Sequence, residues 1–288
     1  MPPDRLDALL SRFRLEARVF HSGLLCGSYD FDAETGYLHF VRRGPVRVHH
    51  AAGKPFTIEE PSAILYAAPT HHRFICAPDT GADLVCASVR IGEPGAANPI
   101  VASLPPCTVI PLAAMPTLGP ALELLFGEAF GQSCGRLAAV NRLFELAVIH
   151  VLRFAMVEGR TNTGMLAGLS DPALAKAIVA MHEQPGHEWT LEELATRAGM
   201  SRSRFASTFH ETVGLTPGNY LAGWRVTVAQ DLLRKGRPLK VVASEVGYAS
   251  PVALSRVFKA KVGSSPREWL ALPTPSVSKP LVVASSPR

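Results

Sequence analysis

A pattern of helix, glycine turn and helix occurs twice between Thr190 and Leu270, and this duplication constrains the fold more than any other feature. From the capping serines onward the two copies keep a constant register of 49 residues, so that Ser201 corresponds to Ser250 and Phe209 to Phe258. Agreement at one fixed spacing over several positions indicates a repeated structural unit. The sequence therefore predicts two similar helical modules in this stretch.

Each copy contains the residues that begin and end helices. Thr190 and Glu193 form a capping-box pattern that starts a helix, and Gly199 ends it because glycine adopts the left-handed conformation at little cost. Ser201 is then placed to cap a second helix, and Gly247 is the corresponding turn in the second copy. Two helices joined by a short glycine turn form a helix-turn-helix, whose second helix enters the major groove of DNA.

The charge of this stretch suits DNA as a partner. Residues 190–270 contain twelve Lys or Arg and six Asp or Glu, a net charge of +6, whereas the whole chain has 29 basic and 24 acidic residues, a net charge of +5. The positive charge is therefore concentrated on the two modules, as binding to phosphates requires. A solvated basic helical domain is the alternative, but it does not explain the duplication.

A long helix is predicted between the modules, from Pro217 to Lys235, because apolar residues recur there at helical spacing. At about 1.5 Å per residue this helix is roughly 27 Å long. That length is close to the ~34 Å that separates successive major-groove faces. Both modules could therefore bind one side of a duplex.

The duplicated stretch resembles the DNA-binding domain of the AraC/XylS transcription regulators. The first copy carries A-x2-A-G-x-S-x3-F-x3-F-x4-G-x2-P-x2-Y-L-x3-R-x3-A-x2-L-L, and the second carries G-Y-x-S-x3-L-x3-F-x4-G-x2-P-x2-W. The resemblance implies that the second helix of each module contacts bases. The implied base-contacting residues are Ser203, Ala206 and Ser207 in the first module, and Val252, Ser255 and Arg256 in the second.

The two modules differ in what they offer to DNA. The first presents only small side chains to the bases, whereas Arg256 in the second can make a bidentate contact with guanine. We expect Arg202, Arg204 and Lys259 to hold phosphates.

Residues 15–110 contain short strand-like runs separated by glycine and proline turns, which favours an all-β barrel or sandwich. This segment resembles the cupin-type sensory domain of one AraC subgroup. The matching stretches are residues 38–44, 61–68, 72–73, 84–86, 98–99 and 104–106. The predicted fold class is α+β with two domains, an N-terminal cupin-like β-barrel with a helical segment and a C-terminal all-α double helix-turn-helix.

Cys26, His39, His72 and Cys86 are the candidate metal ligands. Twelve residues lie between Cys26 and His39, and 13 between His72 and Cys86, so the ligands would come from separate strands and converge inside the barrel. Two thiolates and two imidazoles suit tetrahedral Zn²⁺, and the resemblance implies the same four residues. In one alternative these side chains are ordinary core residues. In another, Cys26 and Cys86 form a redox sensor that releases the metal on oxidation.

Two further helices are predicted at residues 118–130 and 137–157. The second is apolar enough to be buried on more than one side, either against the barrel alone or against a second copy in a homodimer. The predicted domains are a sensory domain with this helical segment at 1–157, a linker at 158–169, the double helix-turn-helix at 170–271 and a disordered tail rich in proline and serine at 272–288.

The remaining sequence features exclude several classes of protein. No apolar run is long enough to span a membrane, and five cysteines without dense spacing favour the cytoplasm. The H-x-H signature of cupin metal sites, a P-loop and a Ser-His-Asp triad are absent from the sequence. We therefore predict a non-enzymatic transcription regulator that binds double-stranded promoter DNA and senses a metal, redox or small-molecule effector.

By resemblance alone we expect an activator that has RNA polymerase as a further partner. Two alternatives stay open at this point. One is a cupin-type metalloenzyme fused to a DNA-binding domain, and the other is an architectural DNA-binding protein without an effector.

Overall fold

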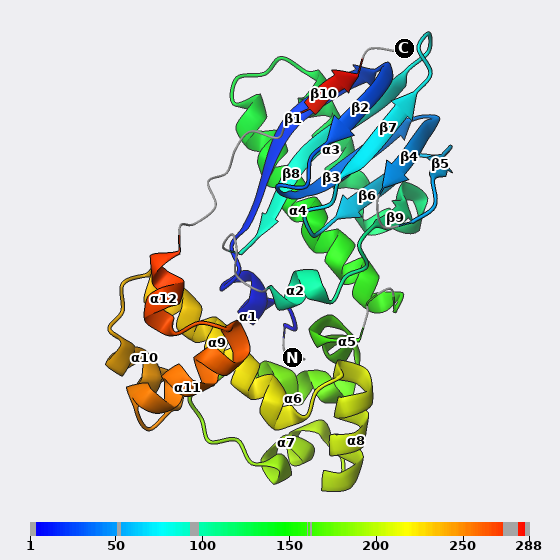
Figure 1. The fold of residues 1–288 in the computed structure, drawn as a ribbon. Helices are drawn as coiled ribbons and strands as arrows, with labels where there is room; N and C mark the ends of the chain where they lie inside the picture. Colours follow the sequence, from blue (N-terminus) through cyan, green and yellow to red (C-terminus); the bar gives the residue numbers. More distant parts are fainter. Residues whose placement is uncertain are drawn as a thin grey trace. The chain divides into compact units, whose positions relative to one another are not determined.

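A computed structural model describes residues 4–50, 53–92, 98–159, 161, 163–272 and 282–285. Its contacts divide the chain into two compact units (Figure 1). The β unit comprises the described residues within 14–91 and 104–160, together with 282–285. The helical unit comprises 4–13, residue 92, residues 98–103 and the described residues from 161 to 272. Each unit is described by itself below.

The β unit contains two five-stranded antiparallel sheets in the described residues. The first has the order β1-β8-β3-β6-β9 and the second β10-β2-β7-β4-β5. The strands are β1 (Leu15–Leu25), β2 (Gly27–Phe31), β3 (Gly36–Arg43), β4 (Val46–His50), β5 (Phe56–Ile58), β6 (Ser62–Tyr66), β7 (His72–Cys76), β8 (Ala82–Ile91), β9 (Thr108–Pro111) and β10 (Val282–Ser285). The predicted β-rich N-terminal domain is thus confirmed as a pair of sheets.

The first sheet is covered on both faces. Along β3, Tyr37 and Val41 belong to the core cluster between the sheets. Phe40, on the opposite face of the same strand, contacts the rings of Phe126 and Phe144 at centroid distances of 6.4 and 5.3 Å. These two rings belong to α3 (Gly119–Phe130) and α4 (Arg136–Val157), which pack on the outside of this sheet (Figure 1). This double coverage explains why β3 is an almost continuous apolar run.

The second sheet has one exposed face, and its strands alternate accordingly. In β7, His72, Phe74 and Cys76 are buried whereas Arg73 and Ile75 are exposed. Period-two alternation of this kind is expected when only one face of a sheet meets the core. The inward face of β7 is the one that carries His72 into the space between the sheets.

The helical unit contains the two predicted modules. The first consists of α7 (Leu191–Ala198) and α8 (Arg202–Val213), and the second of α10 (Leu239–Glu245) and α11 (Pro251–Val262). Between them lies α9 (Pro217–Arg234), within one residue of the predicted helix. The other helices of the unit are α1 (Asp7–Leu10), α2 (Pro99–Ala102), α5 (Met165–Ser170), α6 (Pro172–Glu183) and α12 (Pro266–Ala271), and two 3₁₀ turns, η1 (Leu112–Ala114) and η2 (Pro116–Leu118), belong to the β unit.

The helix ends follow the predicted capping residues. The Thr190 hydroxyl accepts the amide N–H of Glu193, whose carboxylate accepts the Thr190 amide in return, so the capping box is complete. Gly199 ends α7 in the left-handed conformation, with φ of 68°. Ser201 and Ser250 cap α8 and α11 through their side-chain oxygens. Because these are local interactions, the sequence alone sufficed to place them.

Domain boundaries depend on distant contacts and differ from those predicted. The side chain of Arg5 donates to the carbonyls of Leu169 and Ser170, and the ring of Phe13 packs edge-on against Trp224. These contacts place residues 4–13 in the helical unit. Residues 98–103 also belong to this unit. The linker predicted at 158–169 is helical in its second half, where α5 begins and buries its apolar side chains.

The predicted disordered tail lies mostly outside the described residues. Its part that is described, β10, forms a strand that pairs antiparallel with β2, which corrects the prediction for Val282–Ser285. Among the described residues, no helix is both long and apolar enough to cross a membrane.

His182, in the last turn of α6, is a buried polar residue of the helical unit. Its Nε2 lies 2.7 Å from the Tyr220 hydroxyl, and its ring stacks on Trp224 at 4.0 Å. Burial and, secondarily, the charge of Arg12 lower the pKa of His182 from 6.5 to about 3. The imidazole is therefore neutral in the folded protein over most of the acidic range.

This shift predicts acid sensitivity of the helical unit. Unfolding raises the pKa of His182 back to 6.5, so its contribution to stability is complete above pH 6.5 and is lost as the pH falls toward 3, by up to about 1.4 kcal/mol per pH unit. We expect the difference in unfolding free energy between wild type and His182→Gln to change over this range. Urea unfolding can be followed by fluorescence, because all three tryptophans lie in this unit. Parallel pH profiles for the two proteins would contradict the assignment.

Candidate nucleic-acid interface and buried histidine pair

The second helix of each module buries one face and exposes the other. In α8, Phe205 and Phe209 are fully buried, and in α11 the equivalent positions are Leu254 and Phe258, also fully buried. The 49-residue register predicted from the sequence is therefore also a register of packing. The opposite faces of α8 and α11 are free to approach a ligand.

The residues predicted to contact DNA lie on these outward faces or at their margins. Arg202, Ser203 and Ser207 of α8 are exposed and Ala206 is half-buried. In α11, Val252, Arg256 and Lys259 are exposed and Ser255 is half-buried. This placement is compatible with the predicted roles, but contact with bases or phosphates stays a prediction.

The Ser207 hydroxyl is already used within its own helix. It donates toward the backbone carbonyls of Ser203 and Arg204 at 3.2 and 3.1 Å. A hydroxyl bonded in this way has less capacity for a base edge. The first module therefore offers weaker means of base recognition than the second, where Arg256 extends from the helix.

Between residues 200 and 272, seven basic side chains are exposed and form no ion pair within the described part of the chain. By contrast, Arg237 pairs with Glu245 and Lys235 with Asp231, while Arg225 donates to backbone carbonyls. Uncompensated exposed cations are the electrostatic footprint of phosphate binding. The seven are Arg202, Arg204, Lys240, Arg256, Lys259, Lys261 and Arg267.

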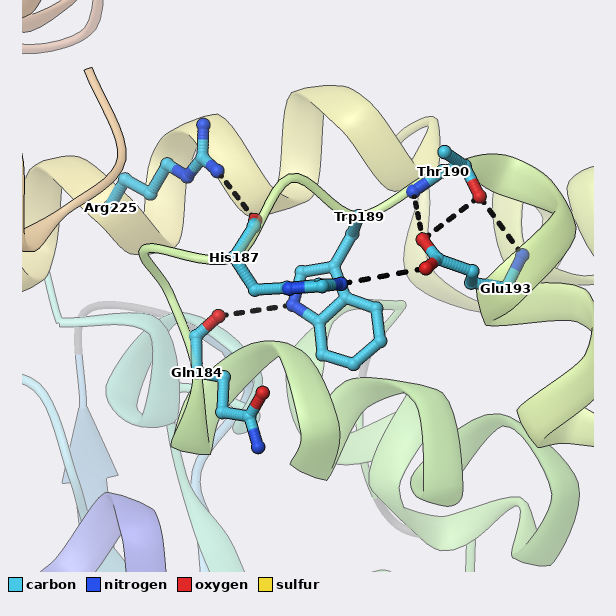
Figure 2. A network of polar contacts seen from close by, with 6 residues as sticks. All are labelled: Gln184, His187, Trp189, Thr190, Glu193 and Arg225. Atoms are coloured by element: carbon cyan, nitrogen blue, oxygen red, sulfur yellow. Dashed lines mark hydrogen bonds and ion pairs between the residues drawn. The ribbon is translucent and has the colours of Figure 1, made fainter. Parts of the chain in front are cut away.

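Arg225, on α9, connects the two modules. Its Nε donates to the Pro185 carbonyl at 2.7 Å, in the loop between α6 and α7. One terminal nitrogen donates to the His187 carbonyl of the same loop at 2.9 Å (Figure 2). The guanidinium also lies 5.5 Å from the ring centroid of Tyr248, which follows the turn of the second module. One planar group thus contacts the loop that leads into the first module and the turn of the second.

The turn of the second module fits closely against this loop. Gly247 has a φ of 79°, and a Cβ atom there would lie 2.7 Å from the Gly186 carbonyl oxygen and 2.8 Å from Arg225. Only glycine satisfies both the backbone conformation and this close approach. The glycine predicted as a simple turn residue therefore also allows the two modules to pack together.

The loop has its own hydrogen bonds. The Trp189 indole donates to the Gln184 carbonyl at 3.0 Å, and His187 Nε2 lies 3.6 Å from the Glu193 carboxylate that completes the capping box (Figure 2). Arg197 lies over the Trp189 ring at 4.7 Å. These contacts hold in one conformation the segment to which Arg225 is bonded.

In the β unit, His39 and His72 approach each other between the sheets, with their Nε2 atoms 2.9 Å apart. His72 Nδ1 lies 2.8 Å from the Thr70 carbonyl, which can only accept, so this nitrogen carries the proton. In a neutral imidazole the Nε2 of His72 is then an acceptor, and His39 Nε2–H is the donor. His39 Nδ1 is consequently an unprotonated acceptor, buried without a hydrogen-bond partner among the described residues.

Aromatic rings enclose this pair. The imidazole of His72 is stacked between Tyr66 at 4.0 Å and Phe31 at 4.6 Å, with interplanar angles of 16° and 10°. Burial lowers the pKa of His72 to about 4, and burial together with His72 holds the pKa of His39 well below its usual range. Both imidazoles are therefore neutral at physiological pH, which is the form that binds metals and hydrogen-bonded ligands.

The four predicted metal ligands are only partly brought together. The Cα of Cys86 is paired with that of His39 across β8 and β3, so their side chains share a face. Cys26 instead lies near Cys76, and burial together with Cys26 raises the pKa of the Cys76 thiol to about 11. Among the described residues, no three His, Cys, Asp or Glu side chains are grouped so that they could hold a metal ion.

The predicted closed four-ligand geometry therefore does not fit this arrangement, and zinc stays a prediction. The redox alternative named Cys26 and Cys86. Burial raises the pKa of the Cys86 thiol above its usual range and so disfavours the reactive thiolate.

Sequence reasoning did not identify Arg225, Tyr66 or Phe31 as site residues. Arg225 was visible as the arginine of the Y-L-x3-R pattern, but its carbonyl partners lie 40 and 38 residues away in sequence. Tyr66 and Phe31 belong to ordinary apolar strands, and only the pairing of the sheets places them against His72.

Two copies of a helix-turn-helix module, with exposed cations that form no ion pair among the described residues, define a DNA-binding protein. A cupin family model matches residues 4–156, and a helix-turn-helix domain model matches residues 194–271. The chain belongs to the AraC/XylS family of transcription regulators, in the group with an N-terminal cupin domain.

Relatives agree with this assignment. An AraC-like transcription regulator of Streptomyces antibioticus is 38% identical over 157 residues, which are 54% of this chain and 52% of that protein. The RCS-specific HTH-type transcriptional activator RclR of Escherichia coli K12 is 27% identical over 236 residues, 80% of this chain and 82% of that protein. The matches span about half the length of the first curated relatives.

Among solved structures, the DNA-binding domain of AdpA in complex with a target DNA is 36% identical, with a TM-score of 0.33. The matched residues make up 35% of this chain and 91% of the AdpA chain.

Replacement of Arg256 tests base recognition by the second module. We expect Arg256→Ala to weaken binding to a preferred duplex by about 1–3 kcal/mol and to relax the preference at one base pair, because a bidentate guanine contact is lost. Lys54→Ala, an exposed cation of the β unit, is the control for net charge. Fluorescence anisotropy at fixed salt measures both. Equal losses for the two variants would show that Arg256 acts only through its charge.

Replacement of Arg225 tests the connection between the modules. Arg225→Gln leaves two backbone carbonyls without their donor, so we expect a loss of about 1–3 kcal/mol in unfolding free energy and a further loss of DNA affinity in the folded protein. Arg197→Gln removes a cation over an aromatic ring but no such hydrogen bond, and should cost less. Urea unfolding followed by tryptophan fluorescence provides the comparison. An Arg225 variant as stable as the Arg197 variant would refute the role.

Proposed function

We propose that this protein activates transcription by binding promoter DNA through both helix-turn-helix modules, and that its cupin-type unit receives the signal that controls binding. The single observation that supports DNA binding best is the set of seven exposed cations, from Arg202 to Arg267, that lie in or beside the duplicated modules and form no ion pair among the described residues. Phosphates are the partner that such a surface needs, and the outward faces of α8 and α11 have the size for adjacent major grooves.

The buried histidine pair supports a sensory role for the cupin-type unit. His39 Nδ1 is a buried acceptor without a partner in the described part of the chain, and such an atom is costly in a well-packed core unless a ligand satisfies it. The neutral imidazole of His72 between two aromatic rings adds a surface that can discriminate shape. A polar small molecule or a metal ion that binds there would change the packing of both sheets at their centre.

The activating role rests on the name of one relative, the E. coli activator RclR. RNA polymerase is then the partner that an activator requires. Leu146 and Val157 are exposed on the same side of α4 and support a homodimer formed through this helix.

The relatives are transcription regulators, and this favours a regulatory role over an enzymatic one. In a cupin-type metalloenzyme the histidines would hold a metal with an open coordination position. The hydrogen bonds of His72 instead occupy both of its nitrogens.

Footprinting of genomic fragments with the full-length protein tests the function. We expect protected promoter fragments, an affinity that falls steeply with salt concentration, and a change in protection with Zn²⁺, an oxidant or a small-molecule extract. His72→Phe keeps an aromatic ring between Tyr66 and Phe31 but removes both nitrogens, so it should retain the basal affinity and lose the response. Absence of salt-sensitive protection on every fragment would refute the DNA-binding role, and a full response in His72→Phe would refute the sensory site.

A further inference from the structure

We propose that the second module recognises a thymine through its 5-methyl group, which packs against Val252, close to the guanine bound by Arg256. This inference rests on the proposed DNA-binding function and assigns a chemical role to one residue of the interface. It predicts that α11 distinguishes thymine from cytosine and from uracil at one position.

Val252 is exposed without a structural reason. Its side chain is 70% accessible, although valine is apolar, and it lies in the first turn of α11 directly after Pro251. The buried face of the same helix is formed by Leu254 and Phe258, and at about 100° per residue Val252 points away from both. Within the described structure the valine makes no contribution to the core.

The repeat provides an internal control for this position. The 49-residue register aligns Val252 with Ser203 of the first module, which is also exposed. The module therefore folds with a small polar residue at this site. A β-branched apolar residue is also a poorer helix former than alanine at an exposed position. Neither packing nor helix propensity explains the valine, whereas an apolar contact in the DNA groove does.

The neighbouring residues place Val252 where bases are contacted. The first turn of a recognition helix approaches the base edges most closely. Arg256 lies four residues later on the same exposed face, about 6 Å along the helix axis. Successive base pairs are separated by about 3.4 Å, so the two side chains can reach base pairs one or two steps apart.

The chemistry of the major groove identifies the partner. Thymine presents a methyl group there, which cytosine lacks, and an apolar side chain is its usual protein contact. The methyl groups of Val252 cannot satisfy the hydrogen-bonding groups of guanine, adenine or cytosine, so those bases would be left partly desolvated without compensation. The arginine and valine together therefore favour a guanine and a nearby thymine.

The test uses duplexes selected from a random-sequence library by the full-length wild-type protein. Each thymine of the selected site is replaced in turn by deoxyuridine, which removes only the methyl group. We expect one position, within two base pairs of the guanine that Arg256 requires, where this replacement weakens wild-type binding about fourfold. For Val252→Ala, the same replacement should have no effect.

Val252→Thr is the matched control, because threonine keeps one methyl group and should retain part of the discrimination. Ser203→Ala changes the equivalent position of the first module and should leave the sensitivity to uracil unchanged. Equal binding of wild type to every uracil-substituted duplex would overturn the inference while leaving the DNA-binding function intact. Failure to select any duplex with salt-sensitive affinity would instead refute the proposed function.

Discussion

The hydrogen bonds from Arg225 to two backbone carbonyls hold together the two helix-turn-helix modules of the helical unit. Arg225 extends from the helix between the modules, and its partners Pro185 and His187 belong to the loop that leads into the first one. The second module meets the same loop at Gly247, where no side chain would fit. Two recognition helices on separate flexible arms would each lose orientational entropy on binding DNA. A pair of helices held in a fixed arrangement loses orientational entropy only once. The contacts of Arg225 and Gly247 therefore favour tight binding even when each individual contact with DNA is modest.

The β unit depends on a different constraint, which is complete burial. Because α3 and α4 cover one sheet and the second sheet covers its other face, the histidines on β3 and β7 meet where both side chains are fully buried. Burial keeps both imidazoles neutral, and aromatic stacking fixes the ring of His72. A group held this rigidly can report the arrival of a ligand, since any accommodation must move strands of both sheets.

Local features were predictable from the sequence and long-range ones were not. Thr190, Ser201 and Ser250 were predicted as caps because a cap and its amide lie within three residues of one another. The meeting of His39 and His72 is a long-range exception, which was expected because the sequence places the two histidines on separate strands of one barrel. The position of Cys26 near Cys76 depends on the exact strand register, which spacing does not reveal. Likewise, nothing in residues 4–13 indicated that they pack against a helix more than two hundred residues away.

The stiffness of α9 has a consequence for the base pairs that lie between the two recognition helices and contact neither of them. A continuous helix of 18 residues, about 27 Å long, separates the modules, and this is shorter than the ~34 Å of one duplex turn. Under the proposed function, a duplex whose successive grooves do not match the separation that the two modules hold fixed must bend to meet both recognition helices. Base steps between the two contact sites would then be selected for the ease with which they bend, and sequence preference would extend to nucleotides without any direct protein contact.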